Sequence, residues 1–230
     1  MQDDKRRKVA IIVPARNEEG RISEVLRAVT GSKLACEFIV VDDGSTDRTS
    51  EVAARFPGVK VLRFETNLGK AAAMFEGVRS TDARIVAYVD ADLGGLKAEH
   101  IDRIILPLLN DDCDMCVGVF RGGKVWSDAA QRVLPYLSGQ RAVKRDLFDA
   151  VPQIADLGMG IEVALNIAAK QRKARILRVV LRGVSNCHKE TKLGIVKGTA
   201  ARIKMYSEVA HAVVSSRTKR PRKRRREWKW

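Results

Sequence analysis

Residues 84–93 read RIVAYVDADL, a short apolar run followed by two carboxylates that a single residue separates. The run predicts a buried strand, and Asp90 and Asp92 then stand where this strand leaves the sheet. Ligands of open α/β sheets bind outside the carboxyl ends of the strands. Two carboxylates there need a positive partner, and a divalent cation carrying a diphosphate is the obvious candidate. Because short acidic pairs are common in turns, the meaning of this pair depends on the residues that precede it.

Upstream of this stretch, apolar runs of strand length alternate with segments of helical spacing. Residues 21–29 carry apolar side chains at i, i+3, i+4 and i+7, the stripe of an amphipathic helix. Strands separated by helix-length segments imply right-handed βαβ units and a parallel sheet. An α/β fold is therefore expected. Its first half would have strands at 9–13, 37–41, 59–64 and 84–89 and helices at 21–29, 46–56 and 69–78.

Beyond Asp92 the pattern is looser, and no internal repeat is visible. Residues 124–137 indicate either a helix or an irregular flap. The clearest domain boundary follows residue 216, so we expect one domain over 1–216 and a tail over 217–230. The remaining expected elements are helices at 101–108, 158–171 and 200–214 and strands at 114–119 and 175–181.

The composition is that of a globular protein, since 45% of the 230 residues are apolar. No run approaches the roughly 18 apolar residues that a membrane-spanning helix needs. The charged start, MQDDKRRK, leads into a strand-like segment and lacks the apolar centre and cleavage site of a secretory signal. We therefore expect a cytoplasmic protein.

The four cysteines include one closely spaced pair, Cys113 and Cys116, while Cys187 directly precedes His188. A zinc site is conceivable, but the second half lacks the paired spacing of such sites. Cys116 lies within MCVGV, which indicates a buried strand. We therefore expect small thiols of the core, without disulfides in a reducing compartment.

The formal net charge is +15, and residues 217–230 contribute nine Lys or Arg against one Glu. A block of like charges repels itself and is expected to be disordered without a partner. Trp228 and Trp230 favour an anionic membrane surface, because Trp prefers the headgroup interface and each basic residue adds about 1 kcal/mol there. Nucleic acid is the less favoured partner for these charges, and a merely solubilising tail is the third interpretation.

Four polar segments stand at corresponding places of the expected βα units, and each is rich in groups that bind a nucleotide. Singly they have ordinary explanations: Asn17 and Asp47 as helix caps, Lys70 as a solvated lysine. Lys70 also opens a helix, where exposed backbone N–H groups suit an anion. All four together are hard to explain in the ordinary way. The segments are PARNEE at 14–19, DDGSTD at 42–47, NLGKA at 67–71 and DAD at 90–92.

In this order, PARNEE, VVDDGSTDRT, NLGKAAA and DADL resemble the N-terminal half of the family 2 glycosyltransferases, which have the GT-A fold. The resemblance covers residues 8–95 and is specific. It implies a Rossmann-like, mainly parallel sheet flanked by helices. It also implies a nucleotide-sugar donor, linked through UDP or GDP, and Mg²⁺ or Mn²⁺ as cofactor. Residues 8–95 would bind the donor, and residues 96–216 the acceptor.

The resemblance implies roles for single residues of the donor half. Asp43 would hydrogen-bond the base, and Lys70 would approach the base or the diphosphate. Asp90 would face the ribose or metal side, and Asp92 would ligate the metal. A cation that bridges a carboxylate and two phosphates stabilises the departing nucleoside diphosphate, which agrees with these positions. The nucleoside pocket would be lined by Pro14, Ala15, Arg16 and Glu18.

Residues 138–145, SGQRAVKR, are similar to a segment of the dolichyl-phosphate mannose synthase-like enzymes that approaches the acceptor. Clustered basic side chains suit a phosphorylated acceptor, because Arg binds phosphate through two parallel hydrogen bonds. The start of a helix with a charged surface is the alternative interpretation. The expected acceptor contacts are Arg121, Gly139, Gln140, Arg141, Arg145 and Arg202.

Glu162 and His188 complete the expected site. GMGIE at 158–162 is similar to the glycine-flanked acidic segment before a helix in these enzymes, so Glu162 is a candidate general base. A first-turn acid that complements the helix dipole is the alternative. Residues 183–194 resemble a loop of the polyprenyl-phosphate glycosyltransferases. They also resemble the glucosyl-3-phosphoglycerate synthases, in which a histidine completes the metal shell opposite the D-x-D, so His188 is a candidate metal ligand.

Two features depart from the family pattern. Gly94 and Gly95 replace the Gln or Ser and the Pro that usually follow the D-x-D and help to shape the metal loop. The C-terminal membrane helices of many dolichyl-phosphate enzymes are absent. The tail at 217–230 could replace them as a reversible anchor at the inner face of the membrane.

The sequence therefore predicts a metal-dependent glycosyltransferase that moves a sugar from an NDP-sugar to a phosphorylated acceptor. A polyprenyl phosphate is the first expectation for the acceptor, and a soluble acid such as 3-phosphoglycerate is the alternative. A protein of another class also fits, namely a GT-A-like binding protein that has lost catalysis and works through its basic tail. The intact Asp90, Asp92 and Lys70 count against it.

Overall fold

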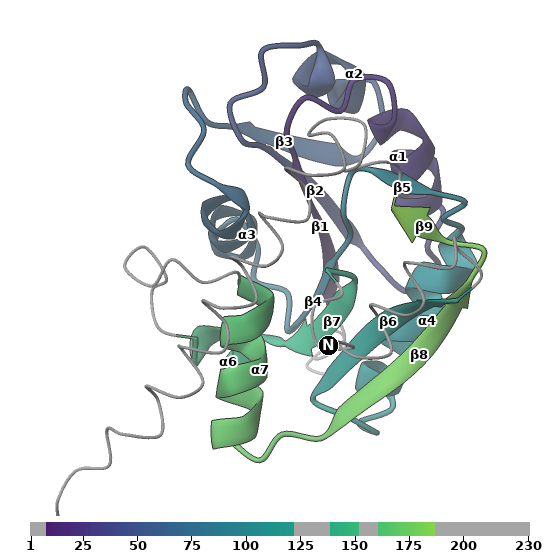
Figure 1. The fold of residues 1–230 in the computed structure, drawn as a ribbon, viewed down its shortest axis with the longest axis vertical. Helices are drawn as coiled ribbons and strands as arrows, with labels where there is room; N and C mark the ends of the chain where they lie inside the picture. The colour runs from purple at the N-terminus through teal and green to yellow at the C-terminus, as the bar shows by residue number, and fades with distance from the viewer. Residues whose placement is uncertain (1–7, 122–138, 152–160, 187–230) are drawn as a thin grey trace, which may run out of the picture. The chain divides into compact units, whose positions relative to one another are not determined.

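The computed structural model describes residues 8–121, 139–151 and 161–186 (Figure 1). The chain divides into two compact units, Met1–Cys187 and His188–Trp230, and every described residue belongs to the first.

Strands and helices alternate along the described residues, as the apolar pattern predicts. The strands are β1 (Val9–Ala15), β2 (Glu37–Asp42), β3 (Val59–Arg63), β4 (Ile85–Tyr88), β5 (Leu93–Gly94), β6 (Met115–Arg121), β7 (Arg141–Lys144), β8 (Ile176–Arg182) and β9 (Ser185–Asn186). The helices are α1 (Ile22–Thr30), α2 (Thr49–Ala54), α3 (Lys70–Arg79), α4 (Ala98–Leu109), α6 (Arg145–Asp149) and α7 (Ile161–Gln171).

Seven strands form one sheet in the order β3-β2-β1-β4-β7-β6-β8, and β5 pairs separately with β9. Strand β1 pairs in parallel with β2 and β4, β2 with β3, and β6 with β8. Only β7, among the described strands of this sheet, runs antiparallel to its neighbours. The sheet is thus mainly parallel, and the carboxyl ends of β2, β1 and β4 lie side by side at one edge.

Strand β1 shows how the sheet is covered on both faces. Ile11 and Val13 pack into one apolar core with α1 and α4, while Ile12 packs into a second core with α3 and α7. Every residue of β1 is buried. A continuous apolar run, rather than a strict alternation, is what a strand between two helical layers requires. Figure 1 shows α3, α6 and α7 together on one side of the sheet.

Residues 141–144 form a strand, so the alternative interpretation of residues 138–145 as the start of a helix is wrong for this stretch. Residues 141–144 form β7, which pairs with β4 through Ile85↔Lys144 and Tyr88↔Arg141, and α6 begins only at Arg145. A strand was not expected there because the stretch has only two apolar residues, Ala142 and Val143, between Arg141 and Lys144. The side chain of Arg141 is nevertheless fully buried.

Several expectations lie outside the described residues: the segment 124–137, the helix at 200–214, the boundary after residue 216 and the tail. Among the described residues, no helix combines the length and apolar composition that crossing a bilayer requires. Cys113 and Cys116 are both buried in the core, as predicted.

Candidate active site

The candidate site lies at the edge of the sheet where β1, β2 and β4 end, because parallel strands bring their following loops together. Pro14 and Ala15 belong to β1 itself and are buried, and their place in a nucleoside pocket stays a prediction. Ala15 pairs with Asp42 at the end of β2, and Arg16 is exposed directly after β1.

Hydrogen bonds join the loop after β1 to the loop after β2. The Asn17 N–H donates to Ser45 Oγ (3.0 Å), and Asn17 Oδ1 accepts from the Thr46 N–H (2.9 Å). The Glu18 N–H donates to Thr49 Oγ1 (2.8 Å). Asn17 adopts a positive φ of 54°, which Asn tolerates better than most residues. Two segments that the sequence predicted separately thus form one continuous wall.

The carboxylate of Glu18 lies in this wall and pairs with Arg21 at 2.7 Å. Its side chain is only 12% exposed, so this predicted donor contact is already part of the loop structure. Asp47 accepts from the Thr49 N–H at 3.0 Å, in the manner of a helix cap. Asp47 thus contacts the first turn of α2, although the N-cap residue itself is Arg48, whose side chain makes no cap hydrogen bond.

Asp43 fastens the third loop to the second. Its carboxylate is buried and accepts from the backbone N–H of Leu68 (2.7 Å) and of Gly69 (3.0 Å to Oδ2). These two residues immediately precede Lys70, the first residue of α3. Asp43 therefore fixes where α3 begins, a role that the sequence did not indicate. Its predicted hydrogen bond to a base stays a prediction.

Lys70 lies between two carboxylates that are far apart in the sequence. Its Nζ is 2.6 Å from Asp90 Oδ1 and 2.8 Å from Glu162 Oε1. The side chain of Lys70 is 40% exposed, whereas those of Asp90 and Glu162 are 21% and 14% exposed. The structure thus joins three of the predicted site residues, from α3, the end of β4 and the start of α7.

Electrostatics keep Lys70 and Glu162 charged. Burial lowers the pKa of Lys70, but the carboxylates of Asp90 and Glu162 outweigh burial and raise it above its ordinary value. Burial raises the pKa of Glu162, but Lys70 and Arg141 outweigh burial and lower it. Glu162 is therefore an ionised carboxylate at neutral pH.

The segment before β7 contacts the second oxygen of Asp90. Gln140 is buried, and its Nε2 donates to Asp90 Oδ2 at 2.8 Å. Gly139 lies so close that a Cβ there would be 2.5 Å from Asp90 Oδ2 and 2.9 Å from Lys70 Nζ. Gly139 and Gln140 thus lie beside Asp90 and Lys70, and their contact with an acceptor stays a prediction.

Arg141 differs from the prediction of an acceptor contact. Its guanidinium is fully buried and donates to the Glu162 carbonyl oxygen (3.2 Å) and to Asn166 Oδ1 (3.4 Å). Burial lowers the pKa of Arg141 and the nearby Glu162 and Asp90 oppose this shift, so the group stays protonated. These bonds hold the first turn of α7.

The assignment of Arg145 to the acceptor site is corrected by the structure. Arg145 follows β7 at the amino end of β4, whereas Asp90 follows the carboxyl end of β4. Its guanidinium donates to the carbonyl oxygens of Thr81 (2.5 Å) and Val78 (3.2 Å). Because those bonds tie α6 to the end of α3, Arg145 has a structural role.

The loop that carries Asp92 is held by the small sheet of β5 and β9, in which Leu93 pairs with Asn186. Gly95 has a φ of +70°, and a Cβ there would collide with the Gly183 carbonyl oxygen. The glycine that departs from the family pattern is therefore required by this close approach. Asp92 itself is half-buried.

The side chains of three predicted site residues lie outside the described part of the structure. His188 and Arg202 lie outside the described residues. Arg121 is the last residue of β6, and only its backbone is described.

The site residues fit a divalent cation brought by a diphosphate. Mg²⁺ is usually bound through one or two carboxylates together with substrate phosphates, and Asp92 offers one such carboxylate. Both oxygens of Asp90 accept from protein donors, so Asp90 holds Lys70. Within the described ranges, no group of three or more His, Cys, Asp or Glu could hold a metal ion alone.

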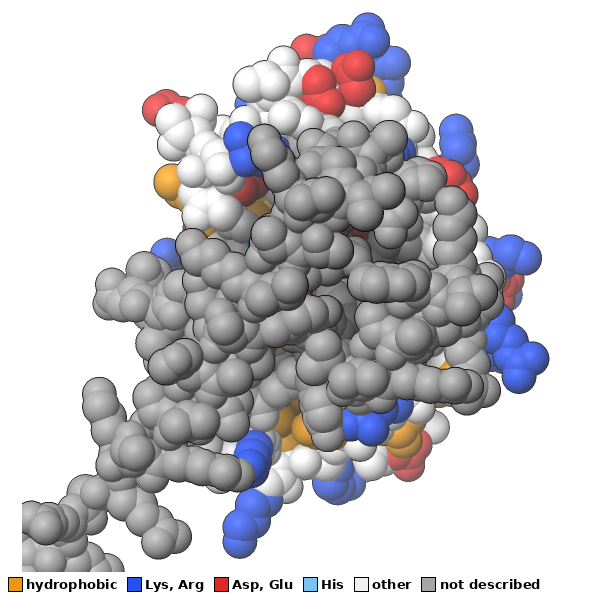
Figure 2. All heavy atoms as spheres, viewed as in Figure 1, with side chains coloured by type: hydrophobic (Ala, Val, Ile, Leu, Met, Phe, Trp, Pro, Cys, Tyr) orange, Lys and Arg blue, Asp and Glu red, His pale blue; other side chains and the backbone are white. Residues whose placement is uncertain are grey.

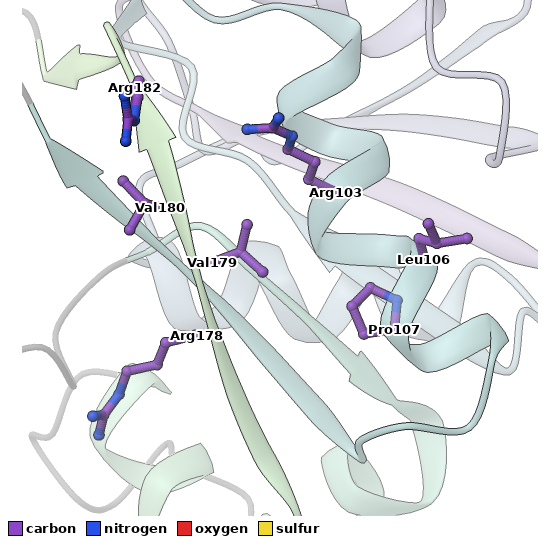
Figure 3. A pocket seen from close by; sticks show the side chains of 7 residues that line it. All are labelled: Arg103, Leu106, Pro107, Arg178, Val179, Val180 and Arg182. Carbon is purple, nitrogen blue, oxygen red and sulfur yellow. The ribbon is translucent and has the colours of Figure 1, made fainter.

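A separate groove of about 670 Å³ lies between α4 and β8, away from these groups (Figure 3). It is lined by Leu106 and Pro107 of α4 and Val179 of β8, with Arg103 and Arg182 beside them. None of the predicted site residues lines it.

The described residues hold 24 Lys or Arg and 21 Asp or Glu. Figure 2 shows basic and acidic side chains along the margin of one face.

The sequence pointed to the site residues but did not indicate which of them contact one another. Lys70 and Glu162 are 92 positions apart, and no local pattern links them. The burial of Arg141 had one sequence signal, the apolar pair Ala142-Val143 beside it, but two residues are too few to define a strand.

Comparisons with known proteins agree with this arrangement. The family model described as "Glycosyl transferase family 2" matches residues 10–155, more than half of the chain. The chain therefore belongs to glycosyl transferase family 2, as its motifs predicted.

Among curated relatives, the glucosyl-3-phosphoglycerate synthase of Mycolicibacterium smegmatis is 30% identical in an alignment 201 residues long, and the match covers 72% of this chain and 65% of that protein. The 4,4'-diaponeurosporenoate glycosyltransferase of Staphylococcus aureus is 34% identical over 101 residues, 42% of this chain and 27% of that protein. The chain thus spans less than two thirds of the length of either relative.

Solved structures of the Mycobacterium tuberculosis glucosyl-3-phosphoglycerate synthase share the fold. The complex with Mn²⁺, UDP-glucose and phosphoglyceric acid has a TM-score of 0.69 at 26% identity, covering 89% of this chain and 80% of that one. The complex with Mn²⁺, UDP and glucosyl-3-phosphoglycerate has a TM-score of 0.67 at 27% identity, covering 81% and 74%. The predicted GT-A fold is confirmed.

Proposed function

We propose that this protein is a metal-dependent glycosyltransferase that uses a UDP-sugar and glycosylates a phosphorylated acceptor. The observation that carries the proposal is the ion-paired group of Lys70, Asp90 and Glu162. It stands at the carboxyl end of β4, beside Asp92 and against the joined loops after β1 and β2. Membership of glycosyl transferase family 2 and the UDP complexes of the solved relatives support the same function.

The donor would lie along the wall formed by the loops after β1 and β2, with its diphosphate toward Asp92. Lys70 stands at the amino end of α3, where backbone N–H groups and its ammonium both favour an anion. In this arrangement the base faces Asp43. Asp90 holds Lys70 at the edge of the pocket.

Asp92 would hold Mg²⁺ or Mn²⁺, and His188 is the proposed second protein ligand. Support for His188 comes from the resemblance of residues 183–194 to the glucosyl-3-phosphoglycerate synthases, in which a histidine completes the metal shell opposite the D-x-D. The cation, when bound, neutralises the negative charge that grows on the leaving nucleoside diphosphate. The protein residues orient the donor and keep the charges of the site balanced.

For the acceptor, 3-phosphoglycerate is now the better candidate. Arg141 and Arg145, two of the basic residues assigned to the phosphorylated acceptor, make internal contacts, which count equally against both acceptors. The solved relatives, however, bind phosphoglyceric acid. Polyprenyl phosphate stays the second candidate, because the basic tail with Trp228 and Trp230 suits a membrane surface.

Glu162 distinguishes the two acceptors chemically. The hydroxyl of 3-phosphoglycerate must lose its proton as it attacks the anomeric carbon, and an ionised carboxylate such as Glu162 can accept it. A phosphate acceptor is already ionised and needs no base. We expect Glu162→Gln to reduce turnover strongly with a hydroxyl acceptor and weakly with a phosphate acceptor.

A transfer assay tests the proposal. The purified protein is incubated with UDP- or GDP-sugars, Mn²⁺ and either 3-phosphoglycerate or a polyprenyl phosphate, and products are detected by mass spectrometry. We expect a product with UDP-glucose and 3-phosphoglycerate that Asp92→Asn abolishes. No product with any donor, together with tight and salt-sensitive RNA binding, would favour the catalytically inactive binding protein.

A further inference from the structure

The segment Gly139, Gln140 and Arg141 contacts both acids that surround Lys70. Gln140 is 1% exposed and donates to Asp90 Oδ2 at 2.8 Å, on the side of the carboxylate away from Lys70. Asp90 is therefore held between an ammonium and an amide, one on each oxygen. Such a carboxylate has one preferred orientation, because each oxygen has a fixed donor.

Arg141 positions the second acid, Glu162, through the backbone of α7. Its guanidinium donates to the Glu162 carbonyl oxygen (3.2 Å) and to Asn166 Oδ1 (3.4 Å), four residues further along α7. Two contacts one turn apart fix both the position and the rotation of α7. The Glu162 carboxylate is thereby directed at Lys70, 2.8 Å away.

Gly139 leaves the room that the side chains of Asp90 and Lys70 occupy. A Cβ at this position would be 2.5 Å from Asp90 Oδ2 and 2.9 Å from Lys70 Nζ, closer than any Cβ approaches another atom. The backbone of residue 139 therefore packs directly against the ion pair. A side chain here would require Asp90, Lys70 or β7 to shift.

Burial makes an acceptor role for Arg141 costly. Its side chain is 0% exposed, and a buried guanidinium is stable only with partners for its charge. The acids of the site supply that charge, since both Glu162 and Asp90 act on the pKa of Arg141. Two cations, Lys70 and Arg141, thus face two anions, Asp90 and Glu162.

We propose that Gly139, Gln140 and Arg141 form a positioning element that sets the two carboxylates around Lys70, and that they do not bind the acceptor phosphate. This deepens the proposed function and rests on it for its kinetic consequence. Its structural consequence, the restraint on Lys70, holds whatever reaction the protein catalyses.

The restraint on Lys70 is measured without any turnover, by the rate at which acetic anhydride modifies its amine. An ammonium that loses one carboxylate partner gives up its proton more readily, and a fall of half to one pKa unit raises the reactive fraction about threefold to tenfold. We expect this increase in Gln140→Leu and in Gly139→Ala. The exposed Lys33 and Lys173 serve as internal references in the same metal-free sample.

Arg145→Lys is the matched control, because Arg145 is a neighbouring arginine whose hydrogen bonds go to Thr81 and Val78 instead. We expect Lys70 to react at its wild-type rate in this variant. An unchanged Lys70 rate in both Gln140→Leu and Gly139→Ala, with melting temperatures near that of the wild type, would overturn the proposal. An equal increase in Arg145→Lys would also overturn it, because it would indicate general loosening.

Kinetics separate positioning from acceptor binding. In Arg141→Lys, which keeps the charge, and in Gln140→Leu, we expect kcat to fall about tenfold or more while KM for the acceptor changes less than about threefold. A large rise in acceptor KM at unchanged kcat would overturn the proposal and restore the acceptor role. If the wild type shows no transfer at all, the proposed function fails, and the Lys70 labelling still decides the positioning role.

Discussion

Lys70 is the residue on which the charge balance of the candidate site depends. Its ammonium is within 2.8 Å of a carboxylate oxygen of both Asp90 and Glu162. Without it, two carboxylates would face each other beside Asp92, and Gln140 and Arg141 would be the compensating groups among the described contacts. This is an arrangement that repels the diphosphate of a donor.

Replacement of Lys70 by Met should therefore impair transfer. We expect kcat to fall about 100-fold, a loss typical of removing one preorganised charged group from an active site. Steady-state kinetics with UDP-glucose measure the effect. Lys60→Met, which removes an exposed lysine of β3, is the control and should retain wild-type kcat. Activity in Lys70→Met equal to that of the control would contradict a role for Lys70 in the reaction.

Tyr88 offers a prediction about stability. Its hydroxyl is buried and has no hydrogen-bond partner among the described residues, and its ring packs against Phe148 at a centroid distance of 5.9 Å. A buried donor without a partner costs about 1 kcal/mol or more. We expect Tyr88→Phe to raise the free energy of unfolding by about 1 kcal/mol in urea denaturation. A loss of stability would show that the hydroxyl has a partner in solution.

At the scale of elements, the sequence predicted the strands and helices of the first half well. Residues 9–13 and 39–41 are buried, so the apolar composition of these runs alone identifies the strands. Strand β7 could not be recognised, because it is four residues long and contains Arg141 and Lys144. The burial of Arg141 is compensated by partners on α7, and that compensation depends on tertiary contacts that no local pattern encodes.

Charged groups join the start of β6, the end of β7 and the start of β8. Asp114 at the start of β6 contacts Lys144 (2.9 Å) at the end of β7 and Arg175 (3.0 Å) before β8. Asp111 contacts the same two cations. Hydrogen bonds from Arg175 are the largest cause that lowers the pKa of Asp114 well below its ordinary value of 3.8.

This network predicts a pH dependence of stability. Because the folded-state pKa of Asp114 is below the unfolded value, its contribution is fully present above about pH 4 and is lost as the pH falls further. We expect Asp114→Asn to lower the free energy of unfolding by about 1 kcal/mol at pH 7, a modest effect because Arg175 is half exposed. The difference from the wild type should shrink at pH 3.

Urea denaturation at both pH values measures this effect. The exposed neighbour Asp112 provides the control, and Asp112→Asn should change stability little at either pH. An Asp114→Asn deficit that is as large at pH 3 as at pH 7 would show that the carboxylate charge is not its cause.

At the scale of the whole molecule, the positive charge is unevenly distributed. The described residues are nearly balanced, with 24 basic and 21 acidic side chains, while residues 217–230 hold nine of the 43 Lys and Arg. The proposed membrane contact therefore belongs to the tail. Deletion of residues 217–230 should lower binding to vesicles of phosphatidylcholine and phosphatidylglycerol by about tenfold or more.

Co-sedimentation of the full chain and the truncated chain measures this binding, with pure phosphatidylcholine vesicles as the control. Unchanged binding after truncation would refute the anchor. Loss of RNA binding on truncation, with vesicle binding unaffected, would instead assign the tail to nucleic acid.

The central claim is that the edge of the sheet between β2 and β4 binds a nucleoside diphosphate together with a divalent cation. Isothermal titration of UDP into the full chain, with and without Mn²⁺, tests it most directly. We predict binding that weakens about tenfold or more without Mn²⁺ and in Asp92→Asn, since the cation links the carboxylate to the phosphates. Equal UDP affinity in all three conditions, or no binding in any, would contradict the account.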